Sequence, residues 1–230
     1  MNLSMYDKVY FTDNVYTEAF WNDSPFWAQR FRLLMEEFSF TSFLDIGCGL
    51  GSLVQAALDE GIDARGLDGA LYAVENSKAP GSVDLVDLNT SPLPYPSSSF
   101  GLVVAFDILE HLDPVRAEFI VSELCRVAAT YVVVKVPVTK IIHQHQVELY
   151  LNHFSCLPVV KQLALLTDLS LWVADYEYNN PPEHICVLSR STWCRLFLTV
   201  GVRQIVCSDN FYNFSHFPVK DTFCFMKIPE

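Results

Sequence analysis

The chain has 230 residues, of which 51% are hydrophobic, so it is long enough to bury a large core and too apolar to be intrinsically disordered. Its 27 acidic residues outnumber its 15 basic residues, which gives a formal net charge of −12, and Lys and Arg form no basic run. This balance argues against a nucleic-acid partner, because binding to a phosphate backbone needs clustered positive charge.

The cysteines and the apolar runs of the sequence indicate the cellular compartment of the protein. Seven cysteines are present, an odd number, and none forms a C-x-x-C pair, so we expect reduced and mostly buried thiols. Residues 1–11 lack the apolar stretch of a secretory signal. The longest apolar run, residues 127–138, is too short to span a membrane and contains Lys135. These observations predict a cytoplasmic protein with no membrane partner.

Residues 1–40 are rich in aromatic side chains and are expected to form an N-terminal lid and helix. Ser24-Pro25 is typical of a helix start, with Ser24 as N-cap and Pro25 in the first helical position, and this helix should reach about Phe38. Residues 1–23 favour neither helix nor strand and are expected to lie across the surface. Their aromatic rings either complete the core or cover a ligand. The candidates for covering a ligand are Tyr16, Phe20 and Trp21.

A strand, a tight turn and a helix follow between residues 43 and 60. An apolar run ends at Asp45 and Ile46, and three glycines then occupy alternate positions. Glycine accepts positive φ and has no Cβ, so the turn can be sharp and a ligand can approach its backbone closely. The free N–H groups at the start of the next helix would face that ligand. The glycines of this turn are Gly47, Gly49 and Gly51.

Strands and helices continue to alternate with short connections as far as residue 137. Such alternation predicts a parallel sheet with right-handed crossovers. A strand that is apolar throughout, such as residues 100–106, is expected to be buried on both faces. The expected strands cover residues 43–46, 63–68, 83–86, 100–106 and 131–136, and the expected helices cover 53–60, 70–77 and 114–127.

The alternation stops after residue 137. Residues 138–188 form an insertion that is expected to be partly helical, and Ser189 is expected to cap a helix through Val200. Two last strands, 202–206 and 222–228, are joined by a loop too short for a crossover helix, so they should be antiparallel. The sequence therefore predicts one α/β domain over residues 1–230, with a doubly wound, Rossmann-like sheet. We expect seven strands, mostly parallel with an antiparallel last strand, and helices on both faces.

The turn between Asp45 and Gly51 resembles the first motif of the class I S-adenosylmethionine-dependent methyltransferases. Asp68 and Asp87 follow at the offsets of that family, after the second and third strands. The segment Phe106 to Leu112 and the string Leu93 to Phe100 are also similar to the family. The resemblance implies S-adenosylmethionine as cofactor, S-adenosylhomocysteine as product, and a methyltransferase activity.

The resemblance also implies roles for individual residues. Asp68 would accept hydrogen bonds from both ribose hydroxyls, because a carboxylate has two acceptor oxygens. Asp87 would receive the adenine amino group, with the backbone of Leu88 beside it. The glycine turn would approach the methionine part of the cofactor, and Asp45 would help to hold that end. The implied cofactor-binding set is Asp45, Gly47, Cys48, Gly49, Gly51, Asp68, Gly69, Asp87, Leu88, Phe106 and Asp107.

Other functions remain open at this stage. An NAD-binding site would also have an acidic residue at the position of Asp68. However, the G-x-G-x-x-G fingerprint of such sites has glycine at the position where this chain has Ser52. Asp45 would also place negative charge near a pyrophosphate, whereas the sulfonium cofactor is positively charged. A domain that binds the cofactor without catalysis, and a methyltransferase that acts on a peptide or protein, are further alternatives.

Methyl transfer needs a general base only if the acceptor is protonated at the working pH. Histidine has a suitable unperturbed pKa, and two histidines are placed to act there as base or acceptor contact. His111 follows the fourth strand, and His184 lies near the end of the insertion. His143, His145 and His153 lack the spacing of a metal site, so no metal is expected.

The acceptor is the least determined feature of the sequence. The insertion at residues 138–188 is rich in aromatic residues and, with the N-terminal lid, would cap an enclosed pocket. Enclosed apolar pockets suit small molecules, so a small-molecule acceptor is the expectation. The same insertion would alternatively serve as the interface of a homodimer.

Overall fold

The computed structural model describes residues 3–13, 17–138, 184–208, 211 and 222–228. Within these residues seven strands form one sheet in the order β3-β2-β1-β4-β5-β7-β6. β7 pairs antiparallel with both β5 and β6, and the other pairs are parallel, so the predicted sheet is confirmed. The strands are β1 (Ser42–Ile46), β2 (Asp63–Asp68), β3 (Val83–Leu85), β4 (Phe100–Phe106), β5 (Ala128–Lys135), β6 (Val202–Ile205) and β7 (Thr222–Lys227).

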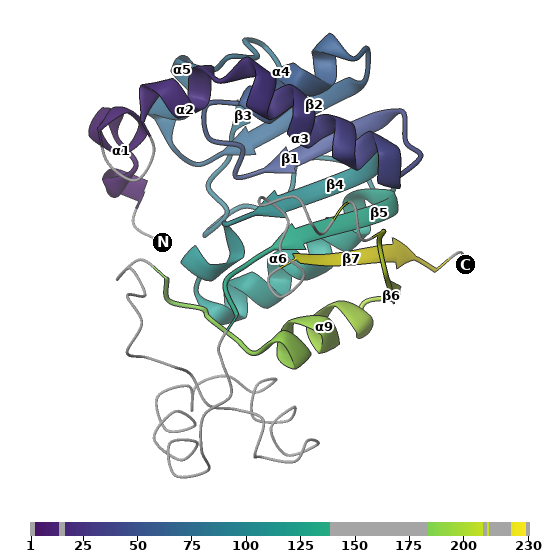
Figure 1. The fold of residues 1–230 in the computed structure, drawn as a ribbon. Helices are drawn as coiled ribbons and strands as arrows, with labels where there is room; N and C mark the ends of the chain where they lie inside the picture. The colour runs from purple at the N-terminus through teal and green to yellow at the C-terminus, as the bar shows by residue number, and fades with distance from the viewer. Residues whose placement is uncertain (1–2, 14–16, 139–183, 209–210, 212–221, 229–230) are drawn as a thin grey trace.

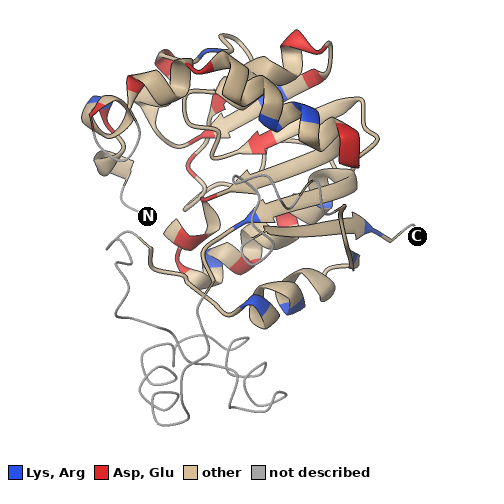
Figure 2. Ribbon diagram, viewed as in Figure 1, with Lys and Arg blue, Asp and Glu red and all other residues tan. Residues whose placement is uncertain are grey.

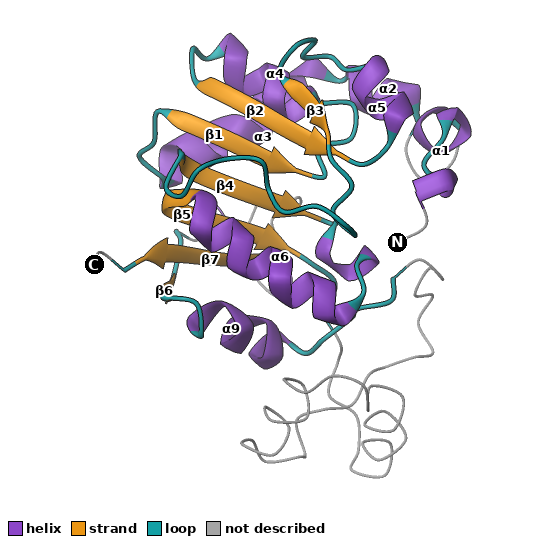
Figure 3. Ribbon diagram, turned by 180° about the vertical axis from the view of Figure 1, so that it is seen from behind, coloured by secondary structure: helices purple, strands orange, loops and turns teal. Residues whose placement is uncertain are grey.

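Helices cover both faces of the sheet (Figures 1 and 3). One face carries α3 (Ser24–Glu37) and α4 (Ser52–Asp59), and Phe31 and Val54 are completely buried against it. The opposite face carries α6 (Pro114–Val127) and α9 (Arg190–Leu198), where Trp193 is completely buried. Such two-sided cover is the reason that the central strands are apolar throughout.

The remaining helices are short. They are η1 (Leu3–Met5), α1 (Lys8–Thr12), α2 (Glu18–Asn22), α5 (Leu71–Glu75) and η2 (Leu109–His111). Among the described residues, no helix combines the length and the apolarity needed to cross a membrane.

The strand order places a topological switch between β1 and β4. The chain runs outward from β1 through β2 to β3, and then returns to β4 on the other side of β1. Open α/β sheets bind ligands outside the carboxyl ends of the strands at such a point. In Figure 1 the N-terminal helices α1 and α2 lie beyond this edge, so the N-terminal segment is placed next to the expected site.

Several local predictions need correction. Residues 3–5, 8–12 and 18–22 are helical rather than irregular, and Asp7 and Thr17 cap α1 and α2 by accepting hydrogen bonds from the Tyr10 and Phe20 N–H groups. Asp23, not Ser24, caps α3, since its carboxylate accepts from the Phe26 N–H. β5 begins at Ala128 rather than at residue 131, and α5 ends at Glu75.

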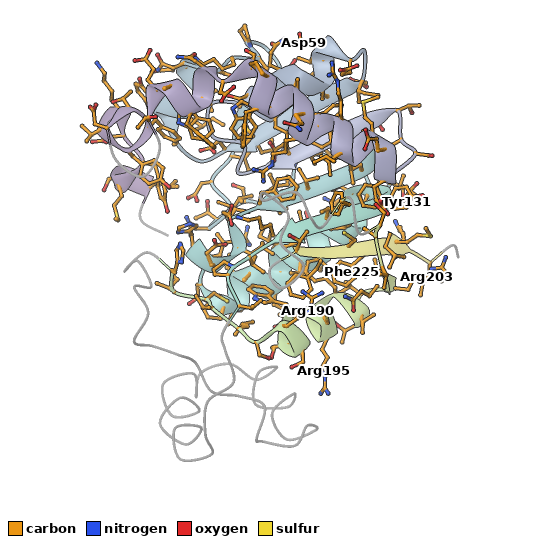
Figure 4. The ribbon with its side chains drawn as sticks, viewed as in Figure 1. Asp59, Tyr131, Arg190, Arg195, Arg203 and Phe225 are labelled. Carbon is orange, nitrogen blue, oxygen red and sulfur yellow. The ribbon has the colours of Figure 1, made fainter. Side chains whose placement is uncertain are left out.

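Other local predictions are confirmed. Ser189 caps α9 by accepting from the Thr192 N–H. Gly61 follows α4 with a φ of +78°, as a glycine that ends a helix should. In Figure 4 Arg195 on α9 points away from the sheet, whereas the Arg190 guanidinium lies 4.3 Å from the centre of the Phe223 ring. The predicted helices of the insertion lie outside the described residues.

Candidate functional site

A cavity of about 270 Å³ opens at the carboxyl ends of β1, β2 and β4. Its floor is the glycine turn and the strand ends, and its cover is the aromatic N-terminal segment. Acidic residues, red in Figure 2, recur at this edge of the sheet. The cofactor-binding residues that the sequence predicted and that line the cavity are Asp45, Gly47, Cys48, Gly49, Asp68, Gly69, Leu88, Phe106 and Asp107.

The glycine turn needs its glycines for two physical reasons. Gly47, Gly49 and Gly51 have φ values of +71°, +54° and +71°, which side chains rarely accept. A Cβ on Gly49 would also lie 2.5 Å from the Trp21 ring, and a Cβ on Gly47 would lie 2.7 Å from Ile108. The absence of side chains thus lets the N-terminal segment and the β4 loop close directly onto the turn.

Asp68 holds the turn and the next helix together. Its two carboxylate oxygens accept the N–H groups of Gly49 and Ala70, each at 2.8 Å. Burial raises the pKa of Asp68 to about 6, and the backbone N–H groups oppose part of that shift. Each carboxylate oxygen has a second lone pair, so the same group can still accept hydrogen bonds from a ligand.

Asp45 is 5% exposed at the end of β1. Burial raises its pKa to about 7, while the positive charge of Arg30 opposes the shift and the negative charge of Asp68 adds to it. Arg30 lies on α3 with its guanidinium 4.8 Å from the centre of the Phe106 ring. The sequence analysis did not predict Arg30 as a site residue. A basic residue on the apolar face formed by Trp27, Phe31 and Leu34 could have indicated it.

Asp107 directly follows β4 and has a φ of +54°, which is rare for a residue with a side chain. Its N–H donates to the Lys135 carbonyl oxygen at 2.8 Å, and its carboxylate pairs with the Lys135 ammonium at 2.5 Å. Lys135 also lines the cavity and was not predicted. The strained backbone and the ion pair fix the end of β4 against the end of β5.

Two predicted cofactor residues are not part of the cavity lining. Asp87 accepts hydrogen bonds from the backbone and the side chain of Asn89, at 2.9 and 2.6 Å. Partial burial would raise the pKa of Asp87, but the hydrogen bonds from Asn89 and Thr90 hold it below its usual value. Gly51 lies at the N-cap of α4, further from the cavity. The roles implied for both stay predictions.

The two predicted histidines meet although they come from distant segments. His111 ends η2, is 6% exposed and lines the cavity, and its ring centre is 4.7 Å from that of His184. The N–H groups of Ile185 and Cys186 donate to the carbonyl oxygen of Glu110, at 2.8 and 2.9 Å. This pairing holds His184 beside η2.

The N-terminal segment packs closely over the cavity. Trp21 lies against Gly49 and stacks on Trp27, with ring centres 5.8 Å apart and an interplanar angle of 6°. The Ser52 hydroxyl donates to the Trp21 carbonyl oxygen at 2.8 Å. Phe20 and Trp21, two of the predicted lid residues, line the cavity, and the third, Tyr16, lies outside the described residues. The N-terminal segment is therefore attached both to the glycine turn and to α4.

Comparisons with known proteins agree with this architecture. Residues 44–130 match a family model described as a methyltransferase domain. No curated protein sequence matches the chain. Among solved structures, the PH0226 protein from Pyrococcus horikoshii OT3 has a TM-score of 0.57 and 13% identity, over 97% of this chain and 99% of that one. An S-adenosylmethionine-dependent methyltransferase from Archaeoglobus fulgidus has a TM-score of 0.55 and 16% identity, over 89% and 93%.

A third similar structure is the magnesium protoporphyrin IX methyltransferase from Synechocystis PCC 6803 with bound S-adenosylhomocysteine. Its TM-score is 0.51 at 13% identity, over 95% of this chain and 91% of that one. At such identities the likeness shows the fold alone, and the family model covers residues 44–130, less than half of the chain. Residues 44–130 therefore match a methyltransferase domain, in agreement with the motifs, and the chain has the fold of solved S-adenosylmethionine-dependent methyltransferases.

Proposed function

We propose that the protein transfers the methyl group of S-adenosylmethionine to a small-molecule acceptor by in-line displacement. The observation that supports this most directly is the enclosure of the cavity, in which the glycine turn and Asp68 face an aromatic cover. Residues 1–230 would act as one domain, in which residues 1–40 form the lid and residues 138–188 cap the acceptor.

The cofactor would lie along the carboxyl ends of β1, β2 and β4. Asp68 would accept the ribose hydroxyls with the lone pairs that Gly49 and Ala70 leave available. Asp87 and Leu88 would border the adenine, with Phe106 against it. The glycine turn and Asp45 would hold the methionine end, where negative charge favours the sulfonium.

The acceptor would approach the methyl group from the side of His111. Its nucleophilic atom forms a bond to the methyl carbon as the bond from that carbon to sulfur breaks, which leaves S-adenosylhomocysteine. The sulfonium methyl is already activated, so alignment and exclusion of water are the main requirements. His111, or His184 beside it, would take the proton of an acceptor that carries one.

Calorimetry with S-adenosylhomocysteine and with NAD tests the cofactor assignment. We expect saturable binding of S-adenosylhomocysteine and none of NAD. An acceptor screen with methyl-labelled S-adenosylmethionine then tests the acceptor class, with small molecules and peptides as separate pools. Transfer of label only to peptides would contradict the small-molecule acceptor and leave the cofactor assignment in place.

A further inference from the structure

Three side chains with metal-binding chemistry gather around His111, which lines the cavity. They are Glu110 and His111 on η2 and His184 from the far end of the insertion. Each offers one ligand atom, and these atoms lie within 4.8 Å of one another. Two imidazoles and one carboxylate are a donor set that divalent transition metals favour, whereas Mg²⁺ and Ca²⁺ prefer oxygen alone.

Glu110 supplies an independent reason to expect a cation. Its side chain is 1% exposed, and within the described part of the chain its Oε2 atom has no hydrogen-bond partner. A buried carboxylate without a partner is costly. A metal ion beside Oε2 would provide the missing partner.

The surrounding contacts hold the three side chains in place. Hydrogen bonds from Ile185 and Cys186 to the Glu110 carbonyl oxygen fix the segment that carries His184. The Tyr6 hydroxyl lies 3.1 Å from His111 Nδ1. A hydrogen bond at the second ring nitrogen is the usual support of a metal-binding histidine.

We propose that Glu110, His111 and His184 bind one divalent transition-metal ion, for which zinc is the probe. Zinc bonds to nitrogen and oxygen are about 2.0–2.2 Å long, so the three ligand atoms must draw in to roughly 3–3.5 Å of one another. Side-chain rotation about fixed backbones provides such a movement. The sequence analysis expected no metal from its histidine spacings, because this set is assembled only by the fold.

The role of the metal site rests on the proposed function, because the ion would activate the acceptor of the methyl group. Three protein ligands leave a coordination position open, and His111 brings that position to the cavity wall. An acceptor hydroxyl bound there would lose its proton to solvent more easily, because the ion stabilises the resulting oxyanion. That oxygen would then attack the methyl carbon as the carbon–sulfur bond breaks. With the ion bound, the imidazoles are ligands and the ion replaces them in activating the acceptor.

Titration calorimetry of the full chain, after chelation and dialysis, tests the site with zinc chloride alone. We expect one zinc ion per chain bound through these residues, and affinity at least about 100-fold weaker in Glu110→Gln and in His184→Gln, since even a lost supporting contact costs 10–100-fold. Glu118→Gln on α6 is the matched control and should bind zinc like the wild type. Cobalt substituted for zinc should show visible absorption bands that Glu110→Gln removes.

Two results would overturn the metal site. One is wild-type protein that binds no zinc although it binds S-adenosylhomocysteine. The other is zinc binding of equal affinity in the wild type and in both variants, since the ion would then lie elsewhere in the chain. Circular dichroism confirms that each variant is folded. Because zinc titration needs neither cofactor nor acceptor, failure of the metal site is distinguishable from failure of the proposed function.

Discussion

At the scale of single residues, Asp68 combines a structural role in the glycine turn with a proposed role in cofactor binding. Its carboxylate already closes the glycine turn onto α5 through the N–H groups of Gly49 and Ala70. The same oxygens are those that the family resemblance assigns to the ribose. Local structure, and in the proposed function also cofactor binding, therefore depend on this one side chain.

The variant Asp68→Ala should weaken binding of S-adenosylhomocysteine by at least about tenfold. It removes the acceptor of two ribose hydroxyls, and a hydrogen bond to a charged group contributes roughly 1.5–3 kcal/mol. Asp63→Ala, at the exposed start of the same strand, is the matched control and should leave affinity unchanged. Calorimetry measures both. Equal affinity in the two variants would show that β2 does not border the ribose.

The raised pKa of Asp45 predicts how the stability of the folded protein depends on pH. Its folded pKa of about 7 lies above the unfolded value of 3.8 because of burial, so the folded chain binds more protons between these values. The stability of the ligand-free protein should therefore fall as pH rises from about 4 to 7. The raised pKa of Asp68 acts in the same direction, and the positive charge of Arg30 on α3 opposes the shift of Asp45.

Thermal melts at pH 5.0 and 7.5 measure this dependence. Asp45→Asn keeps the shape of the side chain without its charge, so the loss of melting temperature between the two pH values should be smaller in the variant by several degrees. Asp63→Asn is the control and should behave like the wild type. An equal loss in all three proteins would show that Asp45 stays ionised in the folded state.

At the scale of elements, the N-terminal segment is the feature that the sequence described least well. Its aromatic residues were expected either to complete the core or to cover a ligand. In the structure they contact both the core and the cavity. Phe11 and Trp21 are buried among other aromatic rings, yet both also line the cavity. The cavity of about 270 Å³ is small for a cofactor and an acceptor together, since ligand pockets usually measure roughly 300–1,000 Å³.

We therefore predict that the lid moves when ligand enters. Residues 1–23 should exchange amide hydrogens fast in the empty protein and slowly with S-adenosylhomocysteine bound. The central strand β4, buried on both faces, is the internal control and should be protected in both states. Hydrogen exchange with mass spectrometry measures both regions. Equal protection of residues 1–23 in the two states would identify the segment as a permanent part of the core.

At the scale of the whole molecule, the fold brings His111 and His184 together across the insertion. The sequence indicated each histidine separately, His111 from its place after the fourth strand and His184 from its place in the insertion, but not that the two would meet. Their ring contact depends on the backbone pairing of Ile185 and Cys186 with Glu110, and so on the position of the whole segment before α9.

Once an acceptor is known, His111→Gln and His184→Gln should each lower the rate by on the order of 10²–10⁴. Affinity for S-adenosylhomocysteine should stay near that of the wild type. Because the two rings act at one place, the double variant should lose little more than the worse single variant. Single-turnover rates measure all three. Losses that multiply in the double variant would show that the histidines act independently.

Much of this molecule follows from local sequence. The glycine turn, the apolar strands and the Ser189 cap were readable because each depends on backbone conformation or periodicity within a few residues. The same was true of the cavity-lining acids Asp45 and Asp68, which stand at the ends of two predicted strands. Hence the sheet, its antiparallel last strand and most of the cavity floor could be predicted.

The rest was decided by tertiary structure. Arg30, Lys135 and Tyr6 reach the cavity from elements whose orientation no local pattern determines. Asp87 accepts short-range hydrogen bonds from Asn89, which its position after the third strand did not predict. The cluster of Glu110, His111 and His184 exists only because the chain returns to η2 after the insertion. Sequence alone determined the elements and the class of chemistry, whereas side chains distant in sequence met only through packing, which no short window of residues encodes.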